Sequence, residues 1–357
     1  MNLSKFAAAL LLLGLGAVAC GGSTNGGGVT PGKKIAFLMP DAAPRYESQD
    51  LPLFQAKVRS MCSDCELVYR NAGGDAAVQR QQAEAALASG ANVLVLDAVD
   101  TSAASVIVTA AAKRHVPVIA YDRLILNTTE LAYYVSFDDA TVGALQGSAL
   151  LSAMKSSARP TVVMIHGDPT DLSAQVLKKA AHGALDGKVT VAKEYDTPSS
   201  SAGGAQEEMT QALAALNNKV DGVYAANDEV ASGVVIAMKA AKLKTLPPVT
   251  GGNAELSAVQ RILTGDQYMT VYRPARQEAE AAATLAYDLA FGVRVPGELT
   301  AGKTADNGAR GVPAVLVQPV SVTRRTLVTT VIADGFWSRA QLCTPDYAQA
   351  CKAAGLS

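Results

Sequence analysis

The chain has 357 residues, of which 49% are hydrophobic and 5% aromatic, and its formal net charge at pH 7 is −1. This length suits two lobes better than one, and cores rich in aliphatic residues are typical of α/β proteins with buried parallel strands. The absence of excess positive charge argues against nucleic acid as a partner.

The first residues predict export and a lipid anchor. Lys5 precedes an apolar run over residues 6–19, which is too short to span a bilayer as a stable helix and fits the core of a signal peptide, residues 1–19. The small residues 17–19 before Cys20 resemble a bacterial lipobox, in which the cysteine is acylated and becomes the new N-terminus. A plain secretory leader is the alternative, because both kinds of cleavage site use small residues. Residues 20–33 would then be the lipidated cysteine and a flexible Gly-rich tether, which places the protein in the periplasm or outside the cytoplasmic membrane.

Strand-like and helix-like segments alternate along the chain. We predict strands at residues 35–39, 67–69, 93–96, 116–121, 161–166, 189–194, 220–225, 248–250 and 269–272. We predict helices at residues 53–61, 76–88 with Asp75 as the cap, 102–114, 143–154, 173–185, 205–216, 230–241 and 256–263. Repeated βαβ units of this length require parallel sheets with right-handed crossovers, so we expect an α/β fold of two Rossmann-like lobes.

Four cysteines follow Cys20, and in an exported protein we expect them to be oxidised. Of the three possible connectivities we favour Cys62–Cys65 and Cys343–Cys351, because each pair closes a short loop. A four-thiolate zinc site fits the first pair but neither the spacing of the second pair nor an oxidising compartment. Thioredoxin-like chemistry is disfavoured because the first pair follows a predicted helix instead of opening one.

Polar side chains follow four of the predicted strands. They are Asp122-Arg123 and the segments 167–171, 227–229 and 251–253. In open α/β sheets ligands bind beyond the carboxyl ends of the strands, so the set predicts a ligand site between facing lobes. Each member alone has a structural alternative, because Asp and Asn are also common in turns and helix caps.

Four longer motifs resemble the xylose-binding proteins of the type I periplasmic-binding fold. They are PVIAYDR at residues 117–123, YVSFDD at 134–139, VDGVYAAND at 220–228 and MTVYRP at 269–274, and the similarity runs from about Lys34 to Trp337. The resemblance implies two Rossmann-like lobes joined by a three-crossing hinge. One lobe would be residues 34–137 plus 271–317, the other 138–270 plus 318–341, and 342–357 a tail with a local disulfide.

The same resemblance implies the substrate-binding component of an ABC importer, without catalysis. Such a protein closes on a monosaccharide, here xylose or a related pentose or hexose, and hands it to a membrane permease. We expect a monomer with neither cofactor nor metal. A sugar-sensing receptor subunit for chemotaxis or signalling would share every sequence feature of the importer component, so this alternative remains open.

Nine positions can be carried over as candidate ligand-binding residues. Arg45 and Tyr46, Asp122 and Arg123, Asp171, and Asn227 match the family's residue types, whereas Ser173 stands for Asn, Asn253 for Asp and Arg273 for Lys. Carboxylates and amides accept hydrogen bonds from sugar hydroxyls, and a planar guanidinium donates two in a fixed fork. No aromatic residue occurs at 197–202, near Ser200, where the family has a stacking Trp. The missing indole leaves space for a larger substituent or for water. Because Asn253 adds a donor and removes a charge, the hydroxyl pattern recognised there must differ from that of the xylose-binding proteins.

Two other classes fit less well. A sugar-responsive repressor begins with a helix-turn-helix, whereas here a leader and a tether stand at that place. An enzyme is disfavoured because the chain has only three histidines and neither a G-x-S-x-G motif nor a P-loop. We interpret His166, at a strand end, as structural. Arg123 would keep the neighbouring Asp122 ionised and unfit to act as a glycosidase acid.

Overall fold

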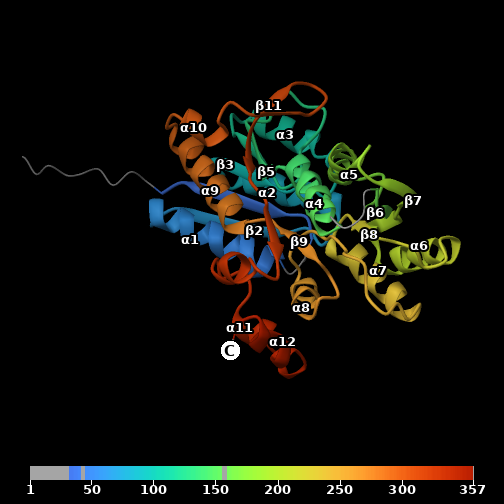
Figure 1. Ribbon diagram of the computed structural model, residues 1–357. Coiled ribbons are helices and arrows are strands. Elements are labelled where there is room, and N and C mark those ends of the chain that lie inside the picture. Colours follow the sequence, from blue (N-terminus) through green and yellow to red (C-terminus); the bar gives the residue numbers. More distant parts are fainter. Residues whose placement is uncertain (1–31, 42–44, 155–158, 357) are drawn as a thin grey trace, which may run out of the picture. The chain divides into compact units, whose positions relative to one another are not determined.

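A computed structural model describes residues 32–41, 45–154 and 159–356 (Figure 1). They belong to one compact unit, residues 32–357. The predicted signal peptide, Cys20 and most of the tether lie outside the described residues. Among the helices that are described, none is both long and apolar enough to cross a membrane.

A seven-stranded sheet combines the first five strands of the chain with two late ones. Its members are β1 (Lys34–Met39), β2 (Glu66–Asn71), β3 (Val93–Leu96), β4 (Val118–Tyr121), β5 (Tyr133–Phe137), β10 (Thr304–Asp306) and β11 (Gly311–Val317). The order is β10-β11-β5-β4-β3-β1-β2, and all pairings are parallel except that of the edge strand β10. Every residue of β3 and β4 is buried, as a parallel sheet covered on both faces requires.

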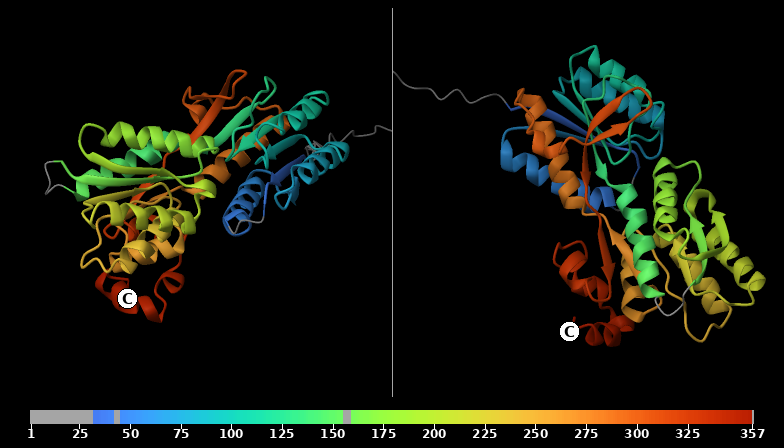
Figure 2. Two further views of the ribbon diagram at one scale, coloured as in Figure 1. Left: turned by 90° about the vertical axis from the view of Figure 1, so that its right-hand side faces the viewer. Right: turned by 45° about the horizontal axis from the view of Figure 1, so that its top comes forward.

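Helices cover both faces of this sheet, and alternate residues of β1 face the two layers. Ile35, Phe37 and Met39 pack with α1 (Leu51–Met61) and α9 (Ala275–Phe291), which lie side by side in Figures 1 and 2. Ala36 and Leu38 pack with α2 (Ala76–Ala88) and α3 (Ser105–Ala112) on the opposite face. The helix α2 begins where expected, because the Asp75 side chain accepts hydrogen bonds from the first backbone N–H groups.

A second parallel sheet has the order β7-β6-β8 and comprises β6 (Thr161–His166), β7 (Thr190–Asp196) and β8 (Gly222–Ala225). One face packs on α4 (Asp139–Ala153) and α5 (Leu172–Leu185), the other on α6 (Ala202–Ala215) and α7 (Asp228–Ala240). The helices α4 and α5 approach closely at Gly143, where a Cβ atom would lie 2.3 Å from the backbone oxygen of Leu177. A larger residue at this position would push the two helices apart.

The remaining strands form an antiparallel pair, β9 (Met269–Tyr272) with β12 (Val320–Thr323). The other helical segments are α8 (Leu256–Thr264), α10 (Gly297–Thr300), α11 (Arg339–Leu342), α12 (Ala348–Ala353) and the short turns η1 (Tyr46–Asp50), η2 (Pro198–Ser200), η3 (Val328–Ile332) and η4 (Pro345–Tyr347). The C-terminal segments share one core cluster with α8. Trp337 is fixed there, because its indole N–H donates to the backbone oxygen of Ala254 at 2.7 Å.

The four cysteines within the described residues are bonded locally. Cys62 is joined to Cys65 with a Cα–Cα distance of 5.4 Å, and Cys343 to Cys351 with 5.8 Å. The first bond closes the loop between α1 and β2, and the second ties the end of α11 to α12.

Several expected elements differ from those in the structure. The helix expected at 102–114 spans only 105–112, because the Asp100 side chain accepts from the N–H groups of Ser102 and Ala103 and holds a turn ahead of it. The strand expected at 248–250 reduces to one parallel bridge between Val249 and Val223. The elements β5, α9, β10, β11, β12, α11 and α12 were not predicted as such.

Candidate ligand-binding site

The nine candidate ligand-binding residues form two groups. The sheet-edge group, Arg45, Tyr46, Asp122 and Arg123, follows the carboxyl ends of β1 and β4 in the seven-stranded sheet. The cavity group, Asp171, Ser173, Asn227, Asn253 and Arg273, lines one cavity of about 140 Å³. Ser200, from the segment without an aromatic residue, lines the same cavity.

Two members of the cavity group are also helix caps. Asp171 accepts from the N–H of Ser173 at 2.9 Å at the start of α5, and Asn227 accepts from the N–H of Val230 at 2.9 Å at the start of α7. Helix capping, the structural alternative, therefore accounts for these two side chains equally well. A cap fixes the side-chain orientation, so both residues present polar atoms to the cavity in a defined geometry.

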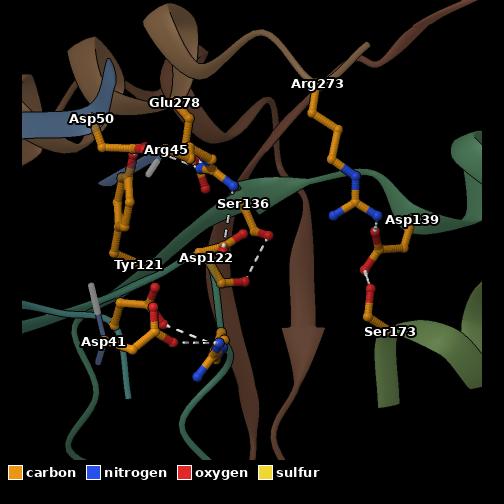
Figure 3. Close-up of polar contacts among 12 residues, drawn as sticks. Asp41, Arg45, Asp50, Tyr121, Asp122, Ser136, Asp139, Ser173, Arg273 and Glu278 are labelled. Atoms are coloured by element: carbon orange, nitrogen blue, oxygen red, sulfur yellow. Dashed lines mark hydrogen bonds and ion pairs between the residues drawn. The ribbon is translucent and has the colours of Figure 1, made fainter. Parts of the chain in front are cut away.

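Arg273 is held in the cavity by a carboxylate that we did not predict. One Arg273 guanidinium nitrogen lies 2.8 Å from Oδ1 of Asp139, and the Ser173 hydroxyl donates to Oδ2 of Asp139 at 2.5 Å (Figure 3). Burial raises the pKa of Asp139, while the charge of Arg273 acts in the opposite direction. Asp139 thus orients two candidate ligand-binding residues from the first turn of α4.

Arg45 is enclosed by carboxylates. Its guanidinium pairs with Asp50 at 3.0 Å, with Asp122 at 3.5 Å and with Glu278 on α9 (Figure 3). The side chains of Asp50 and Glu278 are fully buried, and burial raises the pKa of each carboxyl group although Arg45 opposes the shift. Asp50 also accepts a hydrogen bond from the Tyr121 hydroxyl.

The ring of Phe137 lies next to both groups. The Arg45 guanidinium carbon is 5.3 Å from the ring centroid and that of Arg273 is 5.6 Å from it. Both distances are within the range of cation–π contacts. Phe137 ends β5 and only Asp138 separates it from α4, so the chain connection itself brings the two groups together.

Asp122 and Arg123 occupy a strained turn after β4. Asp122 has φ +57°, in the left-handed region that few non-glycine residues adopt, and its backbone oxygen accepts from the hydroxyls of Tyr134 and Ser136. Such strain is often found at functional sites. Arg123 donates to the backbone oxygen of Ala98 at 3.2 Å and keeps 40% of its side chain exposed.

A larger hollow of about 290 Å³ lies between α2 and α3, lined mainly by Ala, Val and Ile. Of its polar side chains, those of Gln79 and Asp100 bond the local backbone, and Arg80 pairs with Glu84. Gln79 donates to the backbone oxygen of Asp97 and accepts from the N–H of Val99, and Asp100 holds the turn before α3. The cavity of about 140 Å³ is therefore the better candidate for a polar ligand.

Comparison with known proteins identifies the family. A model of the periplasmic binding protein domain matches residues 35–293. The chain belongs to this family. The D-xylose-binding periplasmic proteins of Haemophilus influenzae and Escherichia coli are 32% and 31% identical to it, over 86% and 87% of this chain and 91% and 92% of their own. An ABC transporter solute binding protein from Clostridium phytofermentans, solved with bound β-D-glucose, has a TM-score of 0.74 and 26% identity, covering 87% of this chain and 100% of that one.

The expectations about fold and class are confirmed. This periplasmic binding protein has the type I fold, mixed α/β with mostly parallel sheets. The family consists of sugar-binding transport components without enzymatic activity, and its members are periplasmic. The resemblance to xylose-binding proteins is likewise confirmed.

The structure adds residues to the predicted site and shows that one candidate, Tyr46, is buried. Asp139, Asp50 and Glu278 were missed, although Asp139 lies within the YVSFDD motif. Tyr46 is only 5% exposed and packs in the core, so little of its ring is available to cover a ligand.

Proposed function

We propose that this periplasmic binding protein binds a monosaccharide, xylose or a related pentose or hexose, and delivers it to the membrane permease of an ABC importer. The observation that carries the proposal is the cavity group, in which five candidate residues from four separate chain segments line one small polar cavity. Relatives named for D-xylose and a structural neighbour solved with β-D-glucose support a sugar of this class.

We propose lobes at residues 34–137 plus 271–317 and at 138–270 plus 318–341. In support, the seven-stranded sheet draws its strands from residues 34–137 and 304–317, and the β7-β6-β8 sheet lies within 161–225. A cavity of about 140 Å³ is smaller than the roughly 300–1,000 Å³ of pockets that enclose drug-sized ligands. We infer that the cavity group is one half of the site and that closure brings Asp122 and Arg123 onto the ligand.

The sugar contacts follow from the chemistry of each group. Arg273, oriented by Asp139, and Arg123 would donate paired hydrogen bonds to hydroxyl oxygens. Asp171 would accept from hydroxyls, while the amides of Asn227 and Asn253 can both donate and accept. Because Asn253 replaces a carboxylate of the xylose-binding pattern, we infer that this position sets which sugar is preferred.

A panel of pentoses and hexoses tests the proposal by thermal shift and calorimetry. Specific binding raises apparent stability in proportion to RT ln(1 + [L]/Kd), so at least one monosaccharide should raise the melting temperature. Asn253→Asp should shift the preference toward xylose. The matched control is Asn218→Asp, which changes another exposed Asn with positive φ that does not line the cavity. A panel in which no sugar binds would contradict the proposal.

We further propose that Cys20 is acylated and that the protein works as a monomer. Cys20→Ser should abolish fatty-acid incorporation and leave a soluble protein or an uncleaved precursor. A plain secretory leader would instead give no labelling of the unmodified chain. Light scattering of the purified protein should give the mass of one chain.

A further inference from the structure

Two of the chain's three histidines meet a glutamate beside the β6–β7 pair. His166 ends β6, Glu194 lies on the neighbouring β7, and His182 lies on α5, which covers this face of the sheet (Figure 1). One ligand atom from each of the three side chains lies within 4.8 Å of the other two. None of the three residues lines the cavity of about 140 Å³, so the cluster is separate from the proposed sugar site.

The spacing of these atoms is close to that around a tetrahedral metal ion. Nε2 of His166 and Nε2 of His182 each lie 3.0 Å from the same oxygen, Oε1 of Glu194. With metal–ligand bonds of about 2.0–2.2 Å, neighbouring ligands of a tetrahedral zinc ion are about 3.4 Å apart. Lengthening these two contacts to Glu194 by about 0.4 Å would therefore match the tetrahedral spacing. Two imidazoles and one carboxylate suit Zn²⁺, whereas Ca²⁺ and Mg²⁺ prefer sets of oxygen ligands.

The surroundings of the two rings differ, and those of His182 favour metal binding. Nδ1 of His182 lies 3.0 Å from a carboxylate oxygen of Asp186, the residue directly after α5. A carboxylate on the far nitrogen is the usual support of a metal-bound histidine, because it fixes the tautomer and the ring orientation. His166 is 1% exposed, and its Nδ1 has no hydrogen-bond partner among the described residues, so this ring lacks the support on the far nitrogen that His182 has.

One neighbouring cation opposes a metal ion at this place. Nζ of Lys178 lies 3.2 Å from Oε1 of Glu194, so its charge would repel the ion. Lys178 is also held by both carboxylate oxygens of Asp196, at 2.8 and 2.9 Å. Asp196 can therefore retain the ammonium group while Glu194 turns to the metal. Removal of the Lys178 charge should tighten metal binding.

We propose that His166, His182 and Glu194 bind one Zn²⁺ ion, with Asp186 positioning His182 and water completing the coordination. This replaces our expectation that the chain holds no metal and that His166 is purely structural. The ion would join the β6–β7 pair to α5, whose first turn carries Ser173 and is capped by Asp171 of the cavity group. Zinc would thus fix the position of α5 and, with it, the positions of Ser173 and Asp171.

Zinc titration of the purified, chelator-treated protein by calorimetry, without sugar, tests the proposal. The wild-type protein should bind one Zn²⁺ ion. Asp186→Asn should weaken binding by about 10–100-fold, the usual effect of losing the carboxylate behind a metal-bound histidine. His182→Gln should abolish it, and this partly exposed position is less critical to folding than buried His166. Lys178→Gln should strengthen it.

The matched control is His115→Asn. His115 is exposed and has φ +56°, a conformation that Asn tolerates, so this variant removes a surface histidine without disturbing the cluster. It should bind zinc as the wild-type protein does. Absence of zinc binding in the wild-type protein, or unchanged binding in His182→Gln, would overturn the proposal. Because the titration contains no sugar, either result leaves the proposed transport function untouched.

Discussion

Replacing Arg45 with Met removes the guanidinium that pairs with Asp50, Asp122 and Glu278. The Asp50 and Glu278 side chains are fully buried, so the variant leaves two carboxylates without their cation in a low dielectric. Breaking a buried ion pair in this way destabilises a protein by about 3–5 kcal/mol, against roughly 0–1 kcal/mol for a surface pair. We expect a loss of about 3–5 kcal/mol in the free energy of unfolding near neutral pH.

The loss should depend on pH with a definite sign. Burial already raises the pKa values of Asp50 and Glu278, and without Arg45 they rise further. A carboxyl group whose pKa is raised in the folded state contributes stability at low pH that is lost as the pH rises through that value. The penalty of Arg45→Met should therefore be smaller at about pH 5 than at about pH 8.

Urea unfolding followed by circular dichroism at both pH values measures the effect. Arg80→Met is the matched control, because Arg80 is 56% exposed and pairs only weakly with Glu84 on the surface of α2. A Met at this exposed position should change stability by less than about 1 kcal/mol. If Arg45→Met at about pH 8 is no more destabilising than Arg80→Met, the ion pairs between Arg45 and the buried carboxylates do not stabilise the fold as described.

Three further expectations can be checked independently. Arg123→Lys keeps the charge but loses the fork geometry, so calorimetry should show sugar binding weakened by about 2 kcal/mol, and normal binding would mean that the sugar lies elsewhere. Burial raises the pKa of Asp228 to about 7, so its contribution to stability should fall as the pH rises from about 4 to 8. In urea titrations Asp228→Asn should therefore lose less stability over this range than the wild-type protein does. Replacing both Cys343 and Cys351 with Ser should lower stability by about 2.5 kcal/mol, the loop-closure value for so short a loop, and free thiols at these positions in the exported protein would contradict the pairing.

The central strands could be predicted because the local sequence alone indicates that they are buried. The run Val93–Leu96 is buried on both faces, and a strand of that kind is a continuous aliphatic segment. The helix α9 was missed for the opposite reason. Its buried face consists largely of Ala together with Glu278 and Asp288, so it lacks the pattern of large apolar residues that marks a helix packed on a sheet.

The residues of the candidate site also divide into those that could be predicted from local sequence and those that could not. Asp171 and Asn227 could be found because each follows a recognisable strand and caps the next helix, which is local information. Glu278 could not be found, because it lies 233 residues from Arg45 and only the folded chain brings the two together. Asp139 was missed because the helix was predicted to begin only at residue 143, and because its partner Ser173 lies 34 residues away and is brought near only by folding.

The single tryptophan of the chain provides an optical signal without any label. Trp337 donates its indole hydrogen bond to Ala254, the residue after Asn253 of the cavity group, and its ring meets that of Phe336 at 5.2 Å. All indole emission therefore comes from one environment that is connected to the cavity through one peptide unit. A ligand that reorients Asn253 would change the strength of this hydrogen bond and shift the emission, so sugar binding and release can be timed by stopped-flow fluorescence on the unmodified protein.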